Sequence, residues 1–182
     1  MARRNGRKVR PALTSGSLNE LALAYVGRFA TTRAKLESYL RRKLSERGWA
    51  GEQPADIASV SGRLCELGYV DDAAYAVSKS RALTGRGYGA RRVREALRSA
   101  GVGEEDSEAA SELAEADSVE AALRFARRRR LGPFGEPGGD RSERERALAA
   151  MVRAGHSFAL SKAVLSLQPG GEVDIESLRE KA

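Results

Sequence analysis

Apolar residues return every three or four positions along most of the chain, which is the spacing of an amphipathic helix. Leu36, Leu40 and Leu44 recur at intervals of four, and Val93 and Leu97 follow the same rule. No segment shows the alternation of apolar and polar residues that is typical of a half-buried strand. The pattern therefore predicts an all-α fold.

Glycine, proline and helix-capping residues divide this pattern into separate helices. Thr31 and Thr32 can cap the start of a helix, and Gly48 can end it, because glycine readily adopts the left-handed conformation after a last helical turn. The predicted helices span residues 17–30, 33–47, 54–67, 72–84, 90–100, 104–115, 118–130, 140–154 and 157–168.

An amphipathic helix that is stopped by glycine occurs three times. A shift of 53 residues places Gly48 on Gly101 and Trp49 on Val102, and a further shift of 54 places Gly101 on Gly155. Each copy is too short to bury its own apolar face, so stacking of the copies is expected to complete the core.

We therefore expect three tandem three-helix repeats that form an elongated, curved molecule. The repeats span residues 17–70, 71–116 and 117–169. A basic, flexible arm at 1–16 is expected before them, and a polar tail at 170–182 after them.

Charge is unevenly distributed along the chain. The 182 residues carry 32 Lys and Arg against 25 Asp and Glu, which gives a net charge of +7. Residues 104–120 are strongly acidic, whereas the run 127–130 consists of arginine alone. This distribution favours a protein with faces of opposite sign and a polyanionic partner, and it predicts weak, sequence-blind binding to single- and double-stranded DNA.

The residue types that carry chemistry are scarce. One cysteine, Cys65, and one histidine, His156, exclude a disulfide framework and a multi-histidine metal site. Cys65 is interpreted as a small core residue, and His156 as a capping or solvated side chain. The chain contains no run of about 18 apolar residues that could span a membrane and no secretory signal. We expect no catalytic residue, cofactor or metal, and a cytoplasmic protein.

Three stretches resemble the RecX family of regulatory proteins. The most specific runs from Gly68 to Ala76, Gly-Tyr-Val-Asp-Asp-Ala-Ala-Tyr-Ala, and the next begins at Gly85. The third is the first repeat from Ala22 to Trp49. The positions that carry the family pattern are Gly68, Tyr69, Asp71, Asp72, Tyr75, Gly87, Val93, Leu97 and Gly101. The resemblance implies a bacterial modulator of RecA that lies in the groove of the RecA–single-stranded DNA filament and restrains strand exchange and ATP turnover.

The first of these stretches is interpreted as architecture. Gly68 suits the left-handed position after a helix, and Asp71 suits the N-cap of the next helix. Val70 and Tyr75 then occupy the two positions of a hydrophobic staple. The glycine-rich segment 85–89 resembles a phosphate-binding loop, but no strand precedes it and no Gly-Lys-Ser/Thr follows, so it is predicted to be a helix–helix turn.

Arginines recur at equivalent positions of the repeats, as Arg28 and Arg81 do under the shift of 53. Such a stripe is either solvated charge or a surface for a periodic partner. Arg91, Arg94 and Arg98 share the helix face opposite the apolar seam, so we expect the fold to tolerate their joint replacement. The candidate contacts to RecA or DNA are Arg28, Arg41, Arg42, Arg47, Arg81, Arg86, Arg91, Arg94, Arg98, Arg127 and Arg128.

Two functions remain open from the sequence. One is a monomeric regulator that binds and inhibits the RecA filament. The alternative is a stand-alone helix-turn-helix nucleic-acid-binding protein or repressor, although no heptad or spare apolar stripe predicts its dimer interface. One Trp, five Tyr and four Phe are too few, and too closely tied to helix seams, to predict a base-stacking platform.

Overall fold

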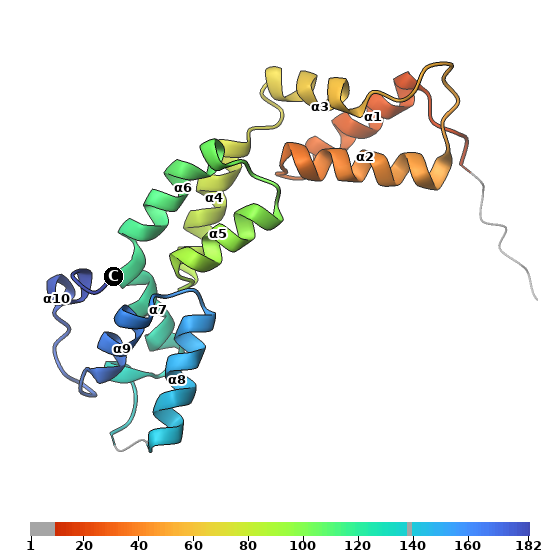
Figure 1. Cartoon of the computed structure of the whole chain (residues 1–182). Helices are drawn as coiled ribbons and strands as arrows, with labels where there is room; N and C mark the ends of the chain where they lie inside the picture. The colour runs from red at the N-terminus through yellow and green to blue at the C-terminus, as the bar shows by residue number, and fades with distance from the viewer. Residues whose placement is uncertain (1–9, 138–139) are drawn as a thin grey trace, which may run out of the picture. The chain divides into compact units, whose positions relative to one another are not determined.

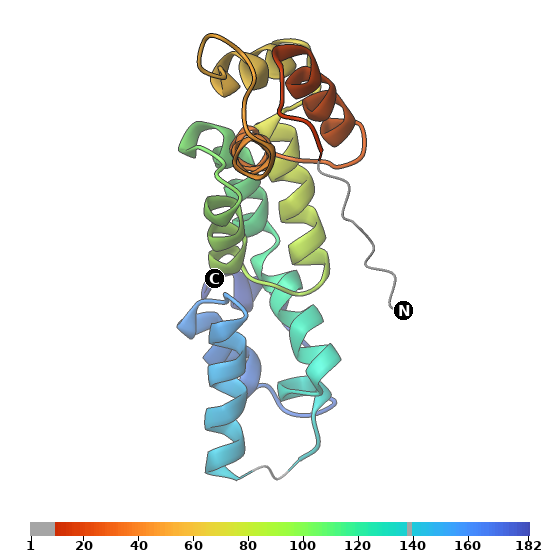
Figure 2. The ribbon, with the colours of Figure 1, turned by 90° about the vertical axis from the view of Figure 1, so that its right-hand side faces the viewer.

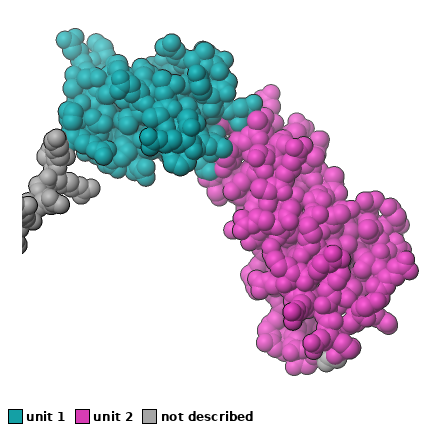
Figure 3. Space-filling view, turned by 180° about the vertical axis from the view of Figure 1, so that it is seen from behind, with its two compact units in different colours: residues 1–71 teal, residues 72–182 magenta. Residues whose placement is uncertain are grey.

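The computed structural model describes residues 10–137 and 140–182, and within these ranges the fold is all-α, as predicted. The chain forms two compact units, residues 1–71 and residues 72–182, which Figure 3 shows in teal and magenta. In the described residues the only β-type pairing is an isolated bridge between Leu13 and Trp49.

The first unit contains three helices, labelled in Figure 1: α1 (Ser15–Val26), α2 (Arg33–Arg47) and α3 (Ile57–Glu66). Side chains of Thr14, Thr32 and Asp56 cap their N-termini by accepting hydrogen bonds from backbone amides three residues later. The cap at Thr14 explains why α1 begins two residues before its predicted start, and α1 also ends at Val26 rather than at residue 30.

The predicted arm at 1–16 is too long, because its last residues belong to the folded unit. Leu13 is fully buried in the core of the first unit. Its amide donates to the carbonyl of Gly48 at 2.9 Å, and its carbonyl accepts from the amide of Ala50 at 2.8 Å. The pairing joins segments far apart in sequence, which helix periodicity cannot reveal. Residues 1–9 of the predicted arm lie outside the described residues.

The second unit contains two further helix triplets (Figure 2). The first triplet is α4 (Asp72–Gly85), α5 (Ala90–Ser99) and α6 (Glu104–Ala116). The second is α7 (Ser118–Arg129), α8 (Arg141–Arg153) and α9 (Phe158–Ser166), with a short 3-10 helix η1 (Gly132–Phe134) and a last helix α10 (Ile175–Arg179). Each triplet of the chain has its own hydrophobic cluster.

The predicted polar tail at 170–182 is packed as part of the third triplet. Leu178 is buried in its cluster, and the guanidinium of Arg179 lies 3.0 Å from the carboxylate of Glu120 at the start of α7. Only the five residues of α10 carry these contacts, which is too short a segment for periodicity to indicate a packed helix.

The glycines that end the repeated helices behave as predicted. Gly48, Gly101 and Gly155 follow α2, α5 and α8, and their φ angles are 78°, 73° and 99°. These angles lie in the region that residues with a Cβ rarely adopt. The three-repeat pattern of the sequence is therefore a pattern of helix ends in the structure.

The family stretch from Gly68 begins at the boundary of the first unit. Gly68 has a φ of 75°, as predicted, and the amide of Tyr69 donates to the carbonyl of Leu64 at 2.9 Å. Asp71 directly precedes the first residue of α4, so it occupies the expected capping position. Val70 belongs to the first core cluster and Tyr75 packs against the second, and their staple stays a prediction.

Candidate functional site

The second and third repeats are joined end to end through their backbones. The amide of Gly89 donates to the carbonyl of Ala154 at 3.0 Å, and the amide of Arg91 donates to the carbonyl of Gly155 at 3.2 Å. Gly89 is the N-cap of α5 and offers no side-chain acceptor. Carbonyls at the end of α8 therefore satisfy amides that every helix leaves unpaired at its N-terminus.

This backbone contact requires glycine on both sides. A Cβ on Gly89 would lie 2.4 Å from the carbonyl oxygen of Gly155, and one on Gly155 would lie 2.5 Å from the amide nitrogen of Arg92. At Gly87, where φ is 80°, a Cβ would lie 2.8 Å from the amide nitrogen of Phe125. The segment 85–89 is a helix–helix turn, as predicted, and its glycines let the third repeat approach.

His156 lies inside the same contact. Its side chain is 4% exposed, and Nε2 donates to the carbonyl oxygen of Gly87 at 3.1 Å. Burial lowers the pKa of His156 to about 4, although the bond to Gly87 acts in the opposite direction. The imidazole is therefore neutral at pH 7, and its edge meets the ring of Phe125 at a centroid distance of 5.7 Å.

The interpretation of His156 as a capping or solvated residue is wrong. The internal repeat of the sequence was the signal that could have shown His156 to be buried. The shifts of 53 and 54 place His156 on Val102 and Trp49, each the residue after a helix-ending glycine. Val102 is 8% exposed and Trp49 packs against the first cluster. In all three repeats, the residue after the helix-ending glycine therefore packs into the interior.

The predicted arginine face of α5 is partly built into the fold. The guanidinium of Arg91 donates to the carbonyl of Val152 in α8, and that of Arg94 pairs with Glu115 in α6. Arg91 and Arg94 therefore contact other helices as well as solvent, and the expectation that the fold tolerates the joint replacement of Arg91, Arg94 and Arg98 stays a prediction. Contacts of this kind join different helices, so the helical spacing of one element cannot predict them.

Arginines after the acidic helix also stabilise the contact between the second and third repeats. The guanidinium of Arg128 donates to the carbonyl of Arg86 and lies 5.9 Å from the centroid of the Tyr88 ring. Arg124, which the sequence analysis did not single out, donates to the carbonyl of Thr84 at 3.2 Å. Arg86 also faces Tyr88, and Arg127 lies 4.8 Å from the centroid of the Phe134 ring.

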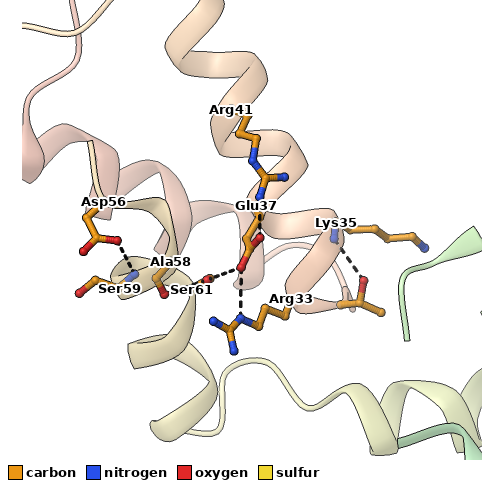
Figure 4. A network of polar contacts seen from close by, with 9 residues as sticks. Arg33, Lys35, Glu37, Arg41, Asp56, Ala58, Ser59 and Ser61 are labelled. Atoms are coloured by element: carbon orange, nitrogen blue, oxygen red, sulfur yellow. Dashed lines mark hydrogen bonds and ion pairs between the residues drawn. The ribbon is translucent and has the colours of Figure 1, made fainter. Parts of the chain in front are cut away.

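A carboxylate organises the arginines at the start of α2, as Figure 4 shows. Glu37 lies 3.1 Å from Nε of Arg33 and 2.7 Å from Nη2 of Arg41, and it accepts a 2.9 Å hydrogen bond from the buried hydroxyl of Ser61. Burial alone would raise the pKa of Glu37, but these partners together hold it below its ordinary value. Arg41 is therefore a structural ion-pair partner within the first unit.

Two further candidates of the first unit also have partners within it. The guanidinium of Arg42 lies 3.8 Å from Glu46 and 5.7 Å from the centroid of the Tyr39 ring. Nε of Arg47 donates to the carbonyl of Pro11 at 2.9 Å and so holds the segment that leads to Leu13.

Three candidate arginines keep an exposed, unengaged head group. Arg28, Arg81 and Arg98 are exposed, and none of their side chains forms a hydrogen bond or ion pair with another described residue. Arg28 and Arg81 are also the pair that the shift of 53 superposes. Among the candidate arginines of the sequence, these three are the ones whose side chains stay unpaired in the described residues.

The third repeat contains a groove that the sequence analysis missed. It lies between the end of α7, the segment after η1, α8 and the end of α9. Apolar side chains such as Leu131 and Leu165 line it together with Arg130 and Arg144. Its lining residues run from Arg129 to Pro169 in the sequence, and only the packing of α7, α8 and α9 brings them together.

No group of three or more His, Cys, Asp or Glu residues in 10–137 and 140–182 is placed to hold a metal ion. In the same described part of the chain, no helix is long and apolar enough to cross a membrane. Cys65 packs against the first cluster as a half-buried residue, as its sequence position predicted.

Comparisons with known proteins agree on one family. Residues 71–110 match the sequence profile of the second three-helix domain of RecX. The chain is 35% identical over 171 residues to the regulatory protein RecX of Myxococcus xanthus, covering 90% of this chain and 89% of that one. It is also 35% identical over 161 residues to the RecX of a Mycobacterium species, covering 84% of each chain.

Solved structures show the same fold. The crystal structure of RecX from Lactobacillus salivarius superposes with a TM-score of 0.59 at 19% identity, over 82% of this chain and 92% of that one. A second RecX crystal structure gives a TM-score of 0.61 at 21% identity, over 82% of this chain and 70% of the other. With relatives this similar along nearly its whole length, the chain belongs to the RecX family of regulatory proteins.

Proposed function

We propose that this chain binds the RecA–single-stranded DNA filament and inhibits the ATPase and strand-exchange activities of RecA. The proposal follows from the RecX resemblance and is supported by the relatedness to regulatory proteins over 90% of the chain. In this proposal the protein acts as a monomer in the cytoplasm, without catalysis, and binds bare DNA only weakly.

The observation that carries the proposal is the recurrence of unengaged arginines. Arg28 and Arg81 occupy equivalent positions of successive repeats, and Arg98 adds a third exposed guanidinium in the second repeat. A filament presents the same acidic groups at regular intervals, so charges that recur with a structural repeat complement it. Arg91, Arg94 and Arg128 are left out of this surface, because they hold the second unit together.

The test is inhibition of DNA-dependent ATP hydrolysis by preformed RecA filaments. Replacing Arg28, Arg81 and Arg98 together by alanine is expected to raise the half-inhibitory concentration about tenfold, a change of ~1.4 kcal/mol. The matched control replaces Arg63, Arg144 and Arg153 by alanine, because these are also exposed and form no ion pair with a described residue.

Equal inhibition by the parent and by the Arg28, Arg81, Arg98 variant would show that these arginines are not the contact. Equal weakening by both triple variants would assign the effect to net charge instead of to a surface. Tight, sequence-selective binding of duplex DNA by the protein alone would support the alternative, a stand-alone repressor.

A further inference from the structure

Three aromatic rings form a continuous row on the first unit. Phe29 follows the end of α1, and its ring centroid lies 5.3 Å from that of Tyr25. The ring of Tyr25 stacks on that of Tyr39 from α2, with a centroid distance of 4.3 Å and an interplanar angle of 18°. Three of the chain's ten aromatic residues therefore gather at one place, which their positions in the sequence did not reveal.

The row has a half-buried inner part and an exposed outer end. Tyr25 and Tyr39 are half-buried and pack against the core cluster of the first unit. Phe29 is 56% exposed, and its backbone amide donates to the carbonyl of Tyr25 at 3.1 Å. The core thus fixes the inner rings, and these hold Phe29 with much of its ring in solvent.

Cationic residues occur next to both ends of the row. Arg28 directly precedes Phe29 in the chain and is exposed, and its side chain pairs with no other described residue. At the other end, the guanidinium of Arg42 and the ammonium of Lys43 lie 5.7 and 5.8 Å from the centroid of the Tyr39 ring. Glu46 pairs with both of these cations, so Arg42, Lys43 and Glu46 together leave one net positive charge beside Tyr39.

An exposed aromatic ring between cations is the arrangement that binds single-stranded nucleic acids. The bases of a duplex are stacked on each other, whereas an unpaired base can stack on a side chain while Lys or Arg contacts the adjacent phosphates. We propose that the row Phe29–Tyr25–Tyr39 is a binding site for single-stranded nucleic acid. An unpaired base stacks on Phe29, and Arg28 and Arg42 pair with backbone phosphates.

This inference deepens the proposed function, which includes weak DNA binding, by giving the chain a site that prefers unpaired strands. The site also changes the expectation from the sequence that the aromatic residues form no stacking surface. Its test does not require RecA, so the two proposals can fail separately.

The experiment measures binding of the full chain to a fluorescent oligothymidylate and to a duplex of equal length by anisotropy. The variant Phe29→Leu keeps an apolar side chain but removes the aromatic face. We expect about tenfold weaker binding of the single strand, within the range for loss of one stacked base, and unchanged binding of the duplex. The control is Phe158→Leu, because Phe158 is also a strongly exposed phenylalanine, at 63%, and lies in the other unit.

Salt dependence separates stacking from charge. Arg28→Ala should reduce the slope of log K against log salt by about 0.7 on the single strand, the value for one lost phosphate contact. Phe29→Leu should leave that slope unchanged, because stacking releases no counterion.

The inference is overturned if Phe29→Leu and Phe158→Leu bind the oligothymidylate equally well, or if Phe29→Leu weakens single strand and duplex alike. It is also overturned if Phe29→Leu loses inhibition of RecA while its affinity for the single strand is unchanged, since Phe29 then contacts protein. Loss of single-strand affinity with full inhibition of RecA would support the site and separate it from the RecA contact.

Discussion

Nε2 of His156 lies 3.1 Å from the carbonyl oxygen of Gly87, a residue 69 positions earlier in the chain. Because Nε2 carries the proton of this bond, Nδ1 of the neutral ring is an acceptor. Nδ1 is buried and has no hydrogen-bond partner among the described residues. A second proton on the ring would therefore bring a charge into the contact between the second and third repeats without a group to stabilise it.

Stability should consequently depend on pH through His156. The unfolded chain has its imidazole near the ordinary pKa of 6.5, whereas burial lowers the folded pKa to about 4. The unfolded state thus takes up the proton first as the pH falls, and stability present above pH 6.5 is lost towards pH 4. Between about pH 7.5 and pH 5 the parent should lose ~2 kcal/mol more than His156→Gln, measured by urea unfolding. Parallel pH profiles for the two proteins would contradict the burial of a neutral histidine.

The close approach of Gly89 to Gly155 gives a sharp steric prediction. Gly89→Ala places a methyl group against the carbonyl of Gly155 and should lower the free energy of unfolding by about 1–3 kcal/mol. Gly85→Ala is the matched control within the same turn, because no atom lies within 4 Å of a Cβ there. Thermal unfolding followed by circular dichroism measures both, and a stable Gly89→Ala protein would show that α8 can move away at no cost.

The arginines of α5 should divide into structural and free side chains. Arg91→Ala removes the hydrogen bond to the carbonyl of Val152 and should cost about 1 kcal/mol. Arg98→Ala should change stability by less than about 0.5 kcal/mol, because the side chain is exposed and unengaged. Denaturant titration of the two single variants checks this order, and equal stabilities would remove Arg91 from the repeat contact.

Glu37 should contribute to stability only while it is ionised. Glu37→Gln keeps an acceptor for the hydroxyl of Ser61 but loses the ion pairs with Arg33 and Arg41, so we expect a loss of about 1 kcal/mol at pH 7. The folded pKa of Glu37 lies below its ordinary value of 4.5. The difference between parent and variant should therefore be fully present above pH 4.5 and should shrink as the pH falls below it. A pH-independent difference in unfolding free energy would assign the effect to packing.

The last helix should matter to the fold despite its polar surroundings. Leu178 is 3% exposed within the third cluster, so Leu178→Ala should cost about 2–3 kcal/mol. Ile175 lies in the same helix and is 39% exposed, so Ile175→Ala should cost clearly less. Unfolding in urea distinguishes the two, and equal small effects would show that residues 170–182 contribute little to the core of the third triplet.

Most of the helices, and the glycines that end several of them, could be predicted from the sequence because they depend on neighbouring residues. The spacing of Leu36 and Leu40 indicates a helix, and both residues are fully buried in the structure. Gly68 and Gly101 were predicted as helix ends from their places after apolar seams, and both have positive φ angles. Family membership was also accessible, because the stretch from Gly68 to Ala76 is specific and lies within one short segment.

Contacts between distant segments could not be predicted in this way. The bond between Arg91 and Val152 joins residues 61 positions apart, and the pairing of Leu13 with Trp49 joins two loops. An arginine on the outer face of a helix has the same local pattern whether it faces solvent or a neighbouring helix end. Only the packing of the helices in each unit could therefore show which arginine side chains stay unpaired.

The hydrogen bonds between the end of α8 and the start of α5 also bear on which repeats unfold together. In an ideal repeat protein each repeat adds its own stability and a side-chain interface, so a terminal repeat can open alone. Here the first amides of α5 find their acceptors in the third repeat, and its opening would strip the second repeat of its helix cap. We therefore expect the second and third repeats to unfold together, and we expect the boundary between independently unfolding parts at Asp71 and not at Asp117.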